Sequence, residues 1–132
     1  MITEEFEKKK FTFRGKTLEE LRQIDIREFA KYLDSRARRS VLRNFDKIEK
    51  FVKRCQKKES RQIRTNLRDI IIVPQLVNMS IHVHNGKNFV PVKISGEMLG
   101  HRLGEFVLTR KIVKHGAAGI GATKSSAALS VK

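Results

Sequence analysis

Residues 77–94, VNMSIHVHNGKNFVPVKI, decide the fold. Apolar side chains alternate with other residues on both sides of an Asn-Gly pair, at Val77, Met79, Ile81 and Val83 before it and at Val90, Val92 and Ile94 after it. This period of two is typical of half-buried strands, and Asn85-Gly86 is the pair that tight hairpin turns favour. We therefore predict a β-hairpin here, preceded by the β-branched run of residues 70–73 that Pro74 closes.

Helical patterns precede the hairpin. The sequence Thr17-Leu-Glu-Glu20 is a capping box, in which the threonine hydroxyl accepts from the Glu20 amide, so a helix should begin there. A second short helical segment is expected over residues 26–33, with Asp34 or Ser35 as the next cap. Over residues 35–58 apolar side chains recur at helical spacing and predict one amphipathic helix, with a stripe formed by Val41, Leu42, Phe45, Ile48, Phe51, Val52 and Cys55.

Together these patterns predict an α+β fold, in which N-terminal helices pack on a short three-stranded sheet that contains the Asn-Gly hairpin. The length of 132 residues suits one domain. We divide the chain into an N-terminal extension (1–16), an α+β domain (17–111) and a flexible, basic C-terminal tail (112–132). Within the extension, Phe11 and Phe13 are the side chains able to dock. Residues 95–106 should form helical turns interrupted by glycines.

The positive charge is unevenly distributed. Residues 1–28 contain seven acids and seven bases, whereas the remaining residues contain 22 bases and seven acids, which accounts for the whole formal charge of +15. Residues 36–68 alone contain thirteen bases and three acids. A solvated helix face normally mixes both signs, so this excess points to a polyanionic partner, and nucleic acid is the leading class.

The candidate RNA contacts are arginines, lysines and one histidine, because guanidinium and ammonium groups neutralise phosphates. They are Arg36, Arg38, Arg39, Arg43, Arg61, Arg64, Arg68, Lys87, His101, Arg102, Arg110, Lys111, Lys114 and Lys124. A second set is expected to be structural: Asn85, Gly86, Gly100, Gly104, Glu105 and Phe106. For Gly100 and Gly104 two interpretations stay open, a plain turn, or a backbone that presents His101 and Arg102 to a sugar-phosphate chain.

Catalysis and metal binding have little support. His82 and His84 lie two apart on one strand face, but His101, Glu97 and Asp69 sit at no fixed ligand spacing from them. We expect no metal, no cofactor and no enzymatic activity, and a metal-dependent nuclease is the disfavoured alternative. The single Cys55 cannot form an internal disulfide, which favours a reducing, cytoplasmic setting. We expect neither a signal peptide nor a membrane-spanning segment.

The segment from Asn85 to Thr109 closely resembles the signature of a known family, the universal small-subunit ribosomal protein numbered nineteen in bacteria and fifteen in eukaryotes. The matching residues are Asn85, Gly86, Lys87, Ile94, Leu99, Gly100, Leu103, Gly104, Glu105, Phe106 and Thr109. Residues 13–21, 36–40, 64–69 and 115–126 further resemble the archaeal and eukaryotic branch of that family.

The resemblance implies a structural, ribosome-bound protein in the head of the small subunit. It would bind the 3′ major domain of small-subunit ribosomal RNA beside the head protein numbered thirteen in bacteria, without forming a homo-oligomer. Its tail would extend toward the decoding site and the aminoacyl-site tRNA. A general nucleic-acid-binding protein outside the ribosome is the alternative that the basic helix and tail alone would permit.

Overall fold

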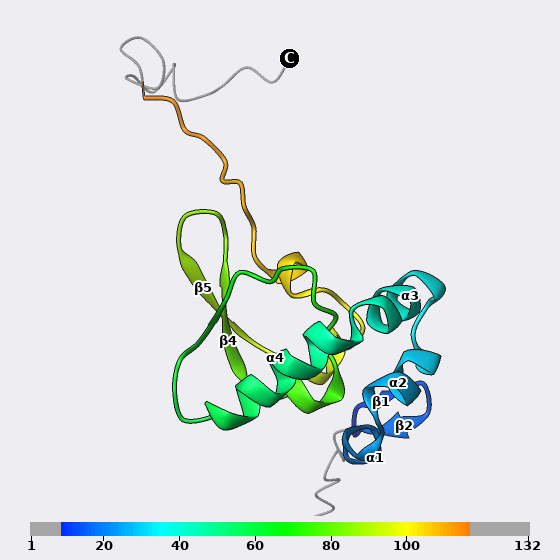
Figure 1. Cartoon of the computed structure of the whole chain (residues 1–132). Coiled ribbons are helices and arrows are strands. Elements are labelled where there is room, and N and C mark those ends of the chain that lie inside the picture. Colours follow the sequence, from blue (N-terminus) through cyan, green and yellow to red (C-terminus); the bar gives the residue numbers. More distant parts are fainter. Residues whose placement is uncertain (1–8, 117–132) are drawn as a thin grey trace, which may run out of the picture.

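The computed structural model describes residues 9–116 (Figure 1). A short hairpin comes first, followed by four helices and then by a three-stranded sheet, so the predicted α+β class is confirmed. The strands and helices are β1 (Thr12–Phe13), β2 (Lys16–Thr17), α1 (Leu18–Gln23), α2 (Ile26–Phe29), α3 (Ser35–Arg43), α4 (Phe45–Lys57), β3 (Ile63–Thr65), β4 (Ser80–His84) and β5 (Phe89–Lys93). Single 3-10 turns occur at η1 (Ala30–Tyr32), η2 (Pro74–Leu76), η3 (Gly96–Met98) and η4 (Leu103–Phe106).

The predicted hairpin is confirmed. Strands β4 and β5 pair antiparallel from Ser80 opposite Lys93 to His84 opposite Phe89. The connection comprises residues 85–88, in which Gly86 has a φ of +97°. The side-chain oxygen of Asn85 accepts hydrogen bonds from the backbone N–H groups of Lys87 (2.9 Å) and Asn88 (2.7 Å), which closes the loop.

The third strand is β3, which runs parallel to β4 with Ile63 opposite Ile81. Its side chains alternate between buried Ile63 and Thr65 and exposed Arg64. The β-branched run of residues 70–73 is buried but forms only an isolated bridge, between Ile71 and Arg102. A parallel partner needs a long crossover, here residues 66–79, which contain that run and η2.

Both predicted caps are confirmed. Thr17 and Glu20 form the complete capping box at the start of α1, and the Asp34 carboxylate accepts from the Ala37 amide at 3.0 Å at the start of α3. The short segment after α1 forms α2 and η1. The helices are tied to the crossover through backbone carbonyls, because Arg22 donates to Val77 and Gln75 donates to Ile24.

The prediction of one helix over residues 35–58 was wrong, because the structure divides it into α3 and α4 at Asn44. This residue has φ −108° and ψ 24°, outside the helical region, and it ends one helix and precedes the next. The bend lets α3 pack against the turn at residues 30–32, while α4 lies across the sheet (Figure 1). Leu42, expected in the apolar stripe, is 53% exposed, whereas Val41 and Ile48 are buried on either side of the bend.

The N-terminal extension ends in a hairpin within the described residues. Its turn is Arg14-Gly15, where both residues have positive φ, 49° and 79°, as a tight two-residue hairpin turn requires. Phe13 docks as expected, with its ring centroid 5.8 Å from that of Phe29.

One apolar core lies between α4, the sheet and the crossover. Cys55 is fully buried in it, and burial raises the pKa of its thiol to about 11. The core also includes residues 70–73 and Leu103, and it extends through them to the glycine-rich turns, which we define as residues 95–106.

Candidate nucleic-acid interface

Three of the four predicted arginines of α3 form a basic stripe, which we define as Arg36, Arg39 and Arg43. All three are exposed, and their spacing of three and four residues places them on one face of the helix. None of them takes part in an ion pair among the described residues. The basic stripe is therefore free to bind phosphates.

Arg38 occupies the opposite side of α3 and has a different environment. Its guanidinium donates to the carbonyls of Ala30 (3.2 Å) and Leu33 (3.1 Å), with a longer contact to Lys31 (3.4 Å). These carbonyls lie at the end of the preceding 3-10 turn, where helical partners run out. Arg38 thus joins α3 to the turn before it.

Arg102 comes from the distant glycine-rich segment and reaches the basic stripe. Its guanidinium donates to the Ser40 hydroxyl at 2.9 Å and to the Asp69 carbonyl at 3.4 Å. Ser40 in turn donates to the Arg36 carbonyl, so its position is fixed within the helix. A fourth guanidinium, 62 residues further along the chain than Ser40, is thereby added beside the stripe.

A cleft separates the N-terminal hairpin from α3 and the glycine-rich turn. Arg36, His101 and Arg102 line it, together with Arg14 at the tip of the hairpin. Arg14 is absent from the contacts predicted from the sequence, although the Arg-Gly pair between two short strand-like segments is typical of a hairpin turn. Positive φ at a residue other than glycine is uncommon, and here it sets Arg14 at the cleft.

The predicted structural pair Glu105 and Phe106 fixes the imidazole of His101. Nδ1 of His101 lies 2.7 Å from Oε2 of Glu105, and the ring packs edge-on against Phe106 at 5.9 Å between centroids. Because Glu105 takes Nδ1, Nε2 is the histidine atom left for an outside partner. His101 and Glu105 remain about half exposed.

Gly100 and Gly104 differ in what they require. Gly100 has a φ of +81°, which side chains rarely adopt, so it forms the turn before His101. Gly104 allows close packing, because a Cβ there would lie 3.0 Å from both the Cβ and the carbonyl oxygen of Arg68. Both glycines therefore meet a geometric requirement of the fold, and the turn that they form sets the position from which the His101 side chain extends. Whether this turn also presents His101 and Arg102 to a sugar-phosphate chain stays a prediction.

Arg68 is a clamp within the domain. Its guanidinium donates to the carbonyls of His84 (2.6 Å), Gly104 (2.8 Å) and Val107 (2.6 Å), which belong to two segments, the end of β4 and the turn at residues 104–107. These bonds place the end of β4 next to the point where the chain leaves the domain. The Arg68 N–H groups that form this clamp are therefore used within the protein and are not available for RNA.

The remaining candidates are spread along the sheet and the chain exit. Lys87 is exposed at its tip, Arg61 is exposed before β3, and Arg64 lies with its Cζ 5.6 Å from the ring centroid of Phe89. The exposed exit segment, residues 108–116, carries Arg110, Lys111 and Lys114 and runs away from the domain (Figure 1). Lys124 lies outside the described residues, as does the tail from residue 117 onward.

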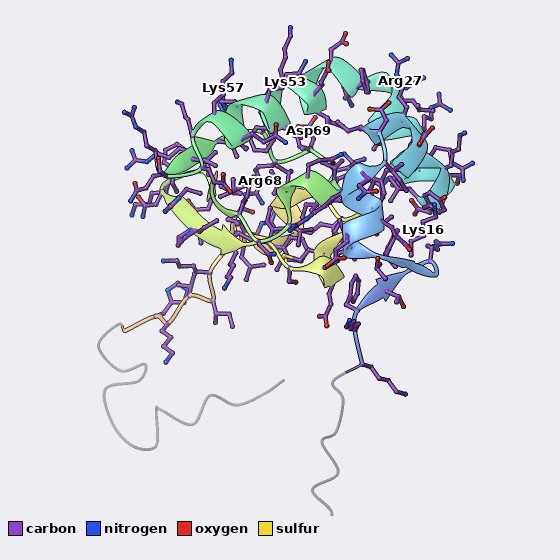
Figure 2. All side chains as sticks on the ribbon, turned by 90° about the horizontal axis from the view of Figure 1, so that it is seen from below. Lys16, Arg27, Lys53, Lys57, Arg68 and Asp69 are labelled. Carbon is purple, nitrogen blue, oxygen red and sulfur yellow. The ribbon has the colours of Figure 1, made fainter. Side chains whose placement is uncertain are left out.

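The bases of α4 are partly neutralised. Lys53 pairs with Glu49 at 2.8 Å, and Lys47 approaches Asp69 at 4.0 Å. Figure 2 shows Lys53 and Lys57 projecting from the outer side of this helix. The uncompensated stripe of α3 is therefore the stronger candidate for RNA contact.

Within residues 9–116, no three His, Cys, Asp or Glu side chains come close enough together to hold a metal ion. His82 and His84 share the outer face of β4, and the Nδ1 atom of His84 accepts from the Gly86 amide at 3.0 Å. No helix in the same range is long and apolar enough to cross a bilayer.

Comparison with known families gives a match to ribosomal protein S19 over residues 34–115, more than half of the chain. The match runs from the Asp34 cap through the basic stripe, the sheet and the glycine-rich turns. This family consists of structural, rRNA-binding proteins of the small ribosomal subunit in the cytoplasm, and they are not enzymes. The predicted resemblance is confirmed. The match favours it over the two alternatives, a metal-dependent nuclease and a nucleic-acid-binding protein outside the ribosome. The chain belongs to the ribosomal protein S19 family.

Proposed function

We propose that this chain binds the 3′ major domain of small-subunit ribosomal RNA in the subunit head and holds RNA helices in place through phosphate contacts. The observation that carries the proposal is the basic stripe, three exposed arginines on one helix face with Arg102 fixed beside them through Ser40. A rigid scaffold that presents guanidinium groups reads RNA shape and backbone more than base sequence.

The contact residues follow from exposure and from unused donors. We propose the basic stripe, Arg14, His101 and Arg102 as one contact surface, and Arg64, Lys87, Arg110, Lys111 and Lys114 as a second, near the hairpin turn and the chain exit. Arg61, which precedes β3, and Lys124 of the tail are further proposed contacts. Arg38 and Arg68 contribute indirectly, because their guanidinium groups hold backbone carbonyls of the domain. Asn85, Gly86, Gly100, Gly104, Glu105 and Phe106 support the loops that present these surfaces.

We assign three parts to the chain: an extension (1–16), the RNA-binding domain (17–111) and a basic tail (112–132). Phe13 against Phe29 joins the end of the extension to the domain. We also propose that the chain belongs to the archaeal and eukaryotic branch of the family, which residues 13–21, 36–40, 64–69 and 115–126 resemble. The tail is proposed to reach toward the decoding site and the aminoacyl-site tRNA, and the head protein numbered thirteen in bacteria is the proposed neighbour.

The salt dependence of binding to a 3′-domain RNA fragment tests the central proposal. With six or more phosphate contacts, affinity should fall on the order of a thousandfold when the salt concentration is raised about fourfold. An RNA fragment from another domain of the same ribosomal RNA is the control. Equal affinity for both fragments, or affinity that is insensitive to salt, would contradict the proposal.

The tail and the neighbour are tested in the assembled subunit. A photo-crosslinker at Lys124 should label tRNA bound at the aminoacyl site, whereas one at Lys9, in the extension, should not. Labelling from neither position would remove the tail proposal. A crosslinker at Lys50, on the exposed side of α4, reports whether the neighbouring head protein lies there.

A further inference from the structure

We propose that the outer face of the sheet around Phe89 is a stacking site for an unpaired nucleotide of RNA. This inference rests on the proposed function, because it names a second mode of contact with the same RNA. The faces of the sheet differ: Ile63, Ile81 and Val92 pack into the core, while Arg64, His82 and Pro91 occupy the opposite face. Phe89, paired with His84, lies on that outer face and is 41% exposed.

An aromatic ring on an exposed strand has two uses. It can stabilise the hairpin through its cross-strand neighbour, and the His84 ring does pack edge-on against Phe89, with centroids 4.9 Å apart. That contact leaves much of the ring open to solvent. Nucleobases stack on such rings whatever their sequence, because every base has a π face.

The surroundings of Phe89 favour a nucleotide over a protein side chain. An open hollow adjoins the ring, and the residues that line it are Arg54, Arg64, Thr65, Asn66, Leu67, His84 and Phe89. Two guanidinium groups and no carboxylate line this hollow, so its charge complements a phosphate. Asn66 offers an exposed amide, which can both donate to and accept from a base edge.

One ring nitrogen and one guanidinium are already positioned for this role. The Gly86 amide donates to Nδ1 of His84, so the ring proton resides on Nε2, which can donate outward. Arg64 stays beside the Phe89 ring, where it can contact the phosphate of a nucleotide whose base stacks on the aromatic ring. The nucleotide would be single-stranded, because paired bases do not offer their faces.

The chain contains no tryptophan, which makes a fluorescence test clean. Phe89→Trp places a single indole in the proposed site, and Leu42→Trp places one at another exposed apolar position, next to Arg43. In the full-length protein, a short oligouridylate should quench Phe89→Trp emission more than Leu42→Trp emission. An RNA duplex of equal length should give no such difference. Equal quenching of the two variants would overturn the stacking site.

Affinity provides a second measurement. Phe89→Leu should weaken binding of the oligouridylate on the order of 5- to 100-fold, the loss associated with one stacked base, whereas Phe89→Tyr should retain affinity. Thermal unfolding of each variant checks the fold. If Phe89→Trp binds the 3′-domain fragment with the expected salt dependence but its emission does not change, the stacking site is wrong and the proposed function stands. Emission that changes only when another small-subunit protein is added would identify a protein contact and would also overturn it.

Discussion

Gly104 and Arg68 fit against each other in two ways. The carbonyl of Gly104 accepts a 2.8 Å hydrogen bond from the Arg68 guanidinium, and the missing side chain of Gly104 makes room for the Cβ and carbonyl of Arg68. One residue supplies a donor, and the other supplies an acceptor together with the space. The turn that leads from His101 to the chain exit therefore depends on the pair, and both members can be tested.

Removing the Arg68 guanidinium should destabilise the domain. Arg68→Met keeps much of the aliphatic stem but leaves the carbonyls of His84, Gly104 and Val107 without their donor, so the free energy of unfolding should fall by about 3 kcal/mol. Arg68→Lys should recover only part of this lost stability, because one ammonium group cannot reach all the carbonyls that the planar guanidinium binds. Urea denaturation measures both. An unchanged midpoint for Arg68→Met would show that the clamp contributes nothing.

A side chain at Gly104 should be poorly tolerated. Gly104→Val would bring branched carbons against the backbone of Arg68, and overpacking of this kind costs roughly 1–3 kcal/mol. We expect weaker incorporation into the small subunit for this variant. Gly116→Ala is the matched control, because a Cβ there meets nothing within 4 Å. Normal incorporation of Gly104→Val would show that the turn can shift to accommodate a side chain and would contradict the requirement for glycine.

Arginines on opposite sides of α3 should give opposite results. Arg39→Gln should leave the unfolding temperature unchanged but reduce the salt slope of RNA binding by about one. Arg38→Gln should lower stability by roughly 1–2 kcal/mol, because the carbonyls of Ala30 and Leu33 lose a donor. Calorimetry and titrations at several salt concentrations separate the two effects. The same response from both variants would contradict the division of roles.

The buried thiol of Cys55 should make the protein less stable at alkaline pH. Its pKa is about 11 in the folded protein, above the ordinary value of 9.0, so between these values the unfolded chain loses a proton that the folded chain keeps. Stability is therefore fully present below pH 9.0 and falls by about 2 kcal/mol as the pH rises toward 11. Cys55→Ala should flatten this part of the stability profile. Urea denaturation across that range measures the difference, and identical profiles would refute it.

Local signals predicted local structure well. The hairpin, the capping box at Thr17 and the cap at Asp34 each depend on residues within a few positions of one another, and all three are confirmed. The parallel strand β3 could not be recognised, because it is three residues long and its partner begins fifteen residues after it ends. The break at Asn44 also escaped prediction, because the apolar period continues through it.

The candidate interface was predictable as a charge excess but not as a surface. Arg36 and Arg38 look equivalent in the sequence, and only the position of the preceding turn directs Arg38 toward carbonyls. Likewise, the end of β4 and the turn at residues 104–107 are brought together at Arg68 by tertiary packing, which the sequence does not reveal. Whether each candidate contacts RNA stays a prediction, because contact is defined by both molecules.

The hydrogen bond from Arg68 to the Val107 carbonyl has a consequence for avidity. It fixes the place where the exit segment begins, next to the end of β4, so the bases at residues 110–114 always start from one defined point of the domain. When the folded domain binds RNA, those bases are held at a high effective concentration near the same RNA. Each of their weak contacts then forms with a smaller loss of entropy than it would for a free peptide. One internal hydrogen bond thus lets a short basic segment add to binding as a tethered second ligand.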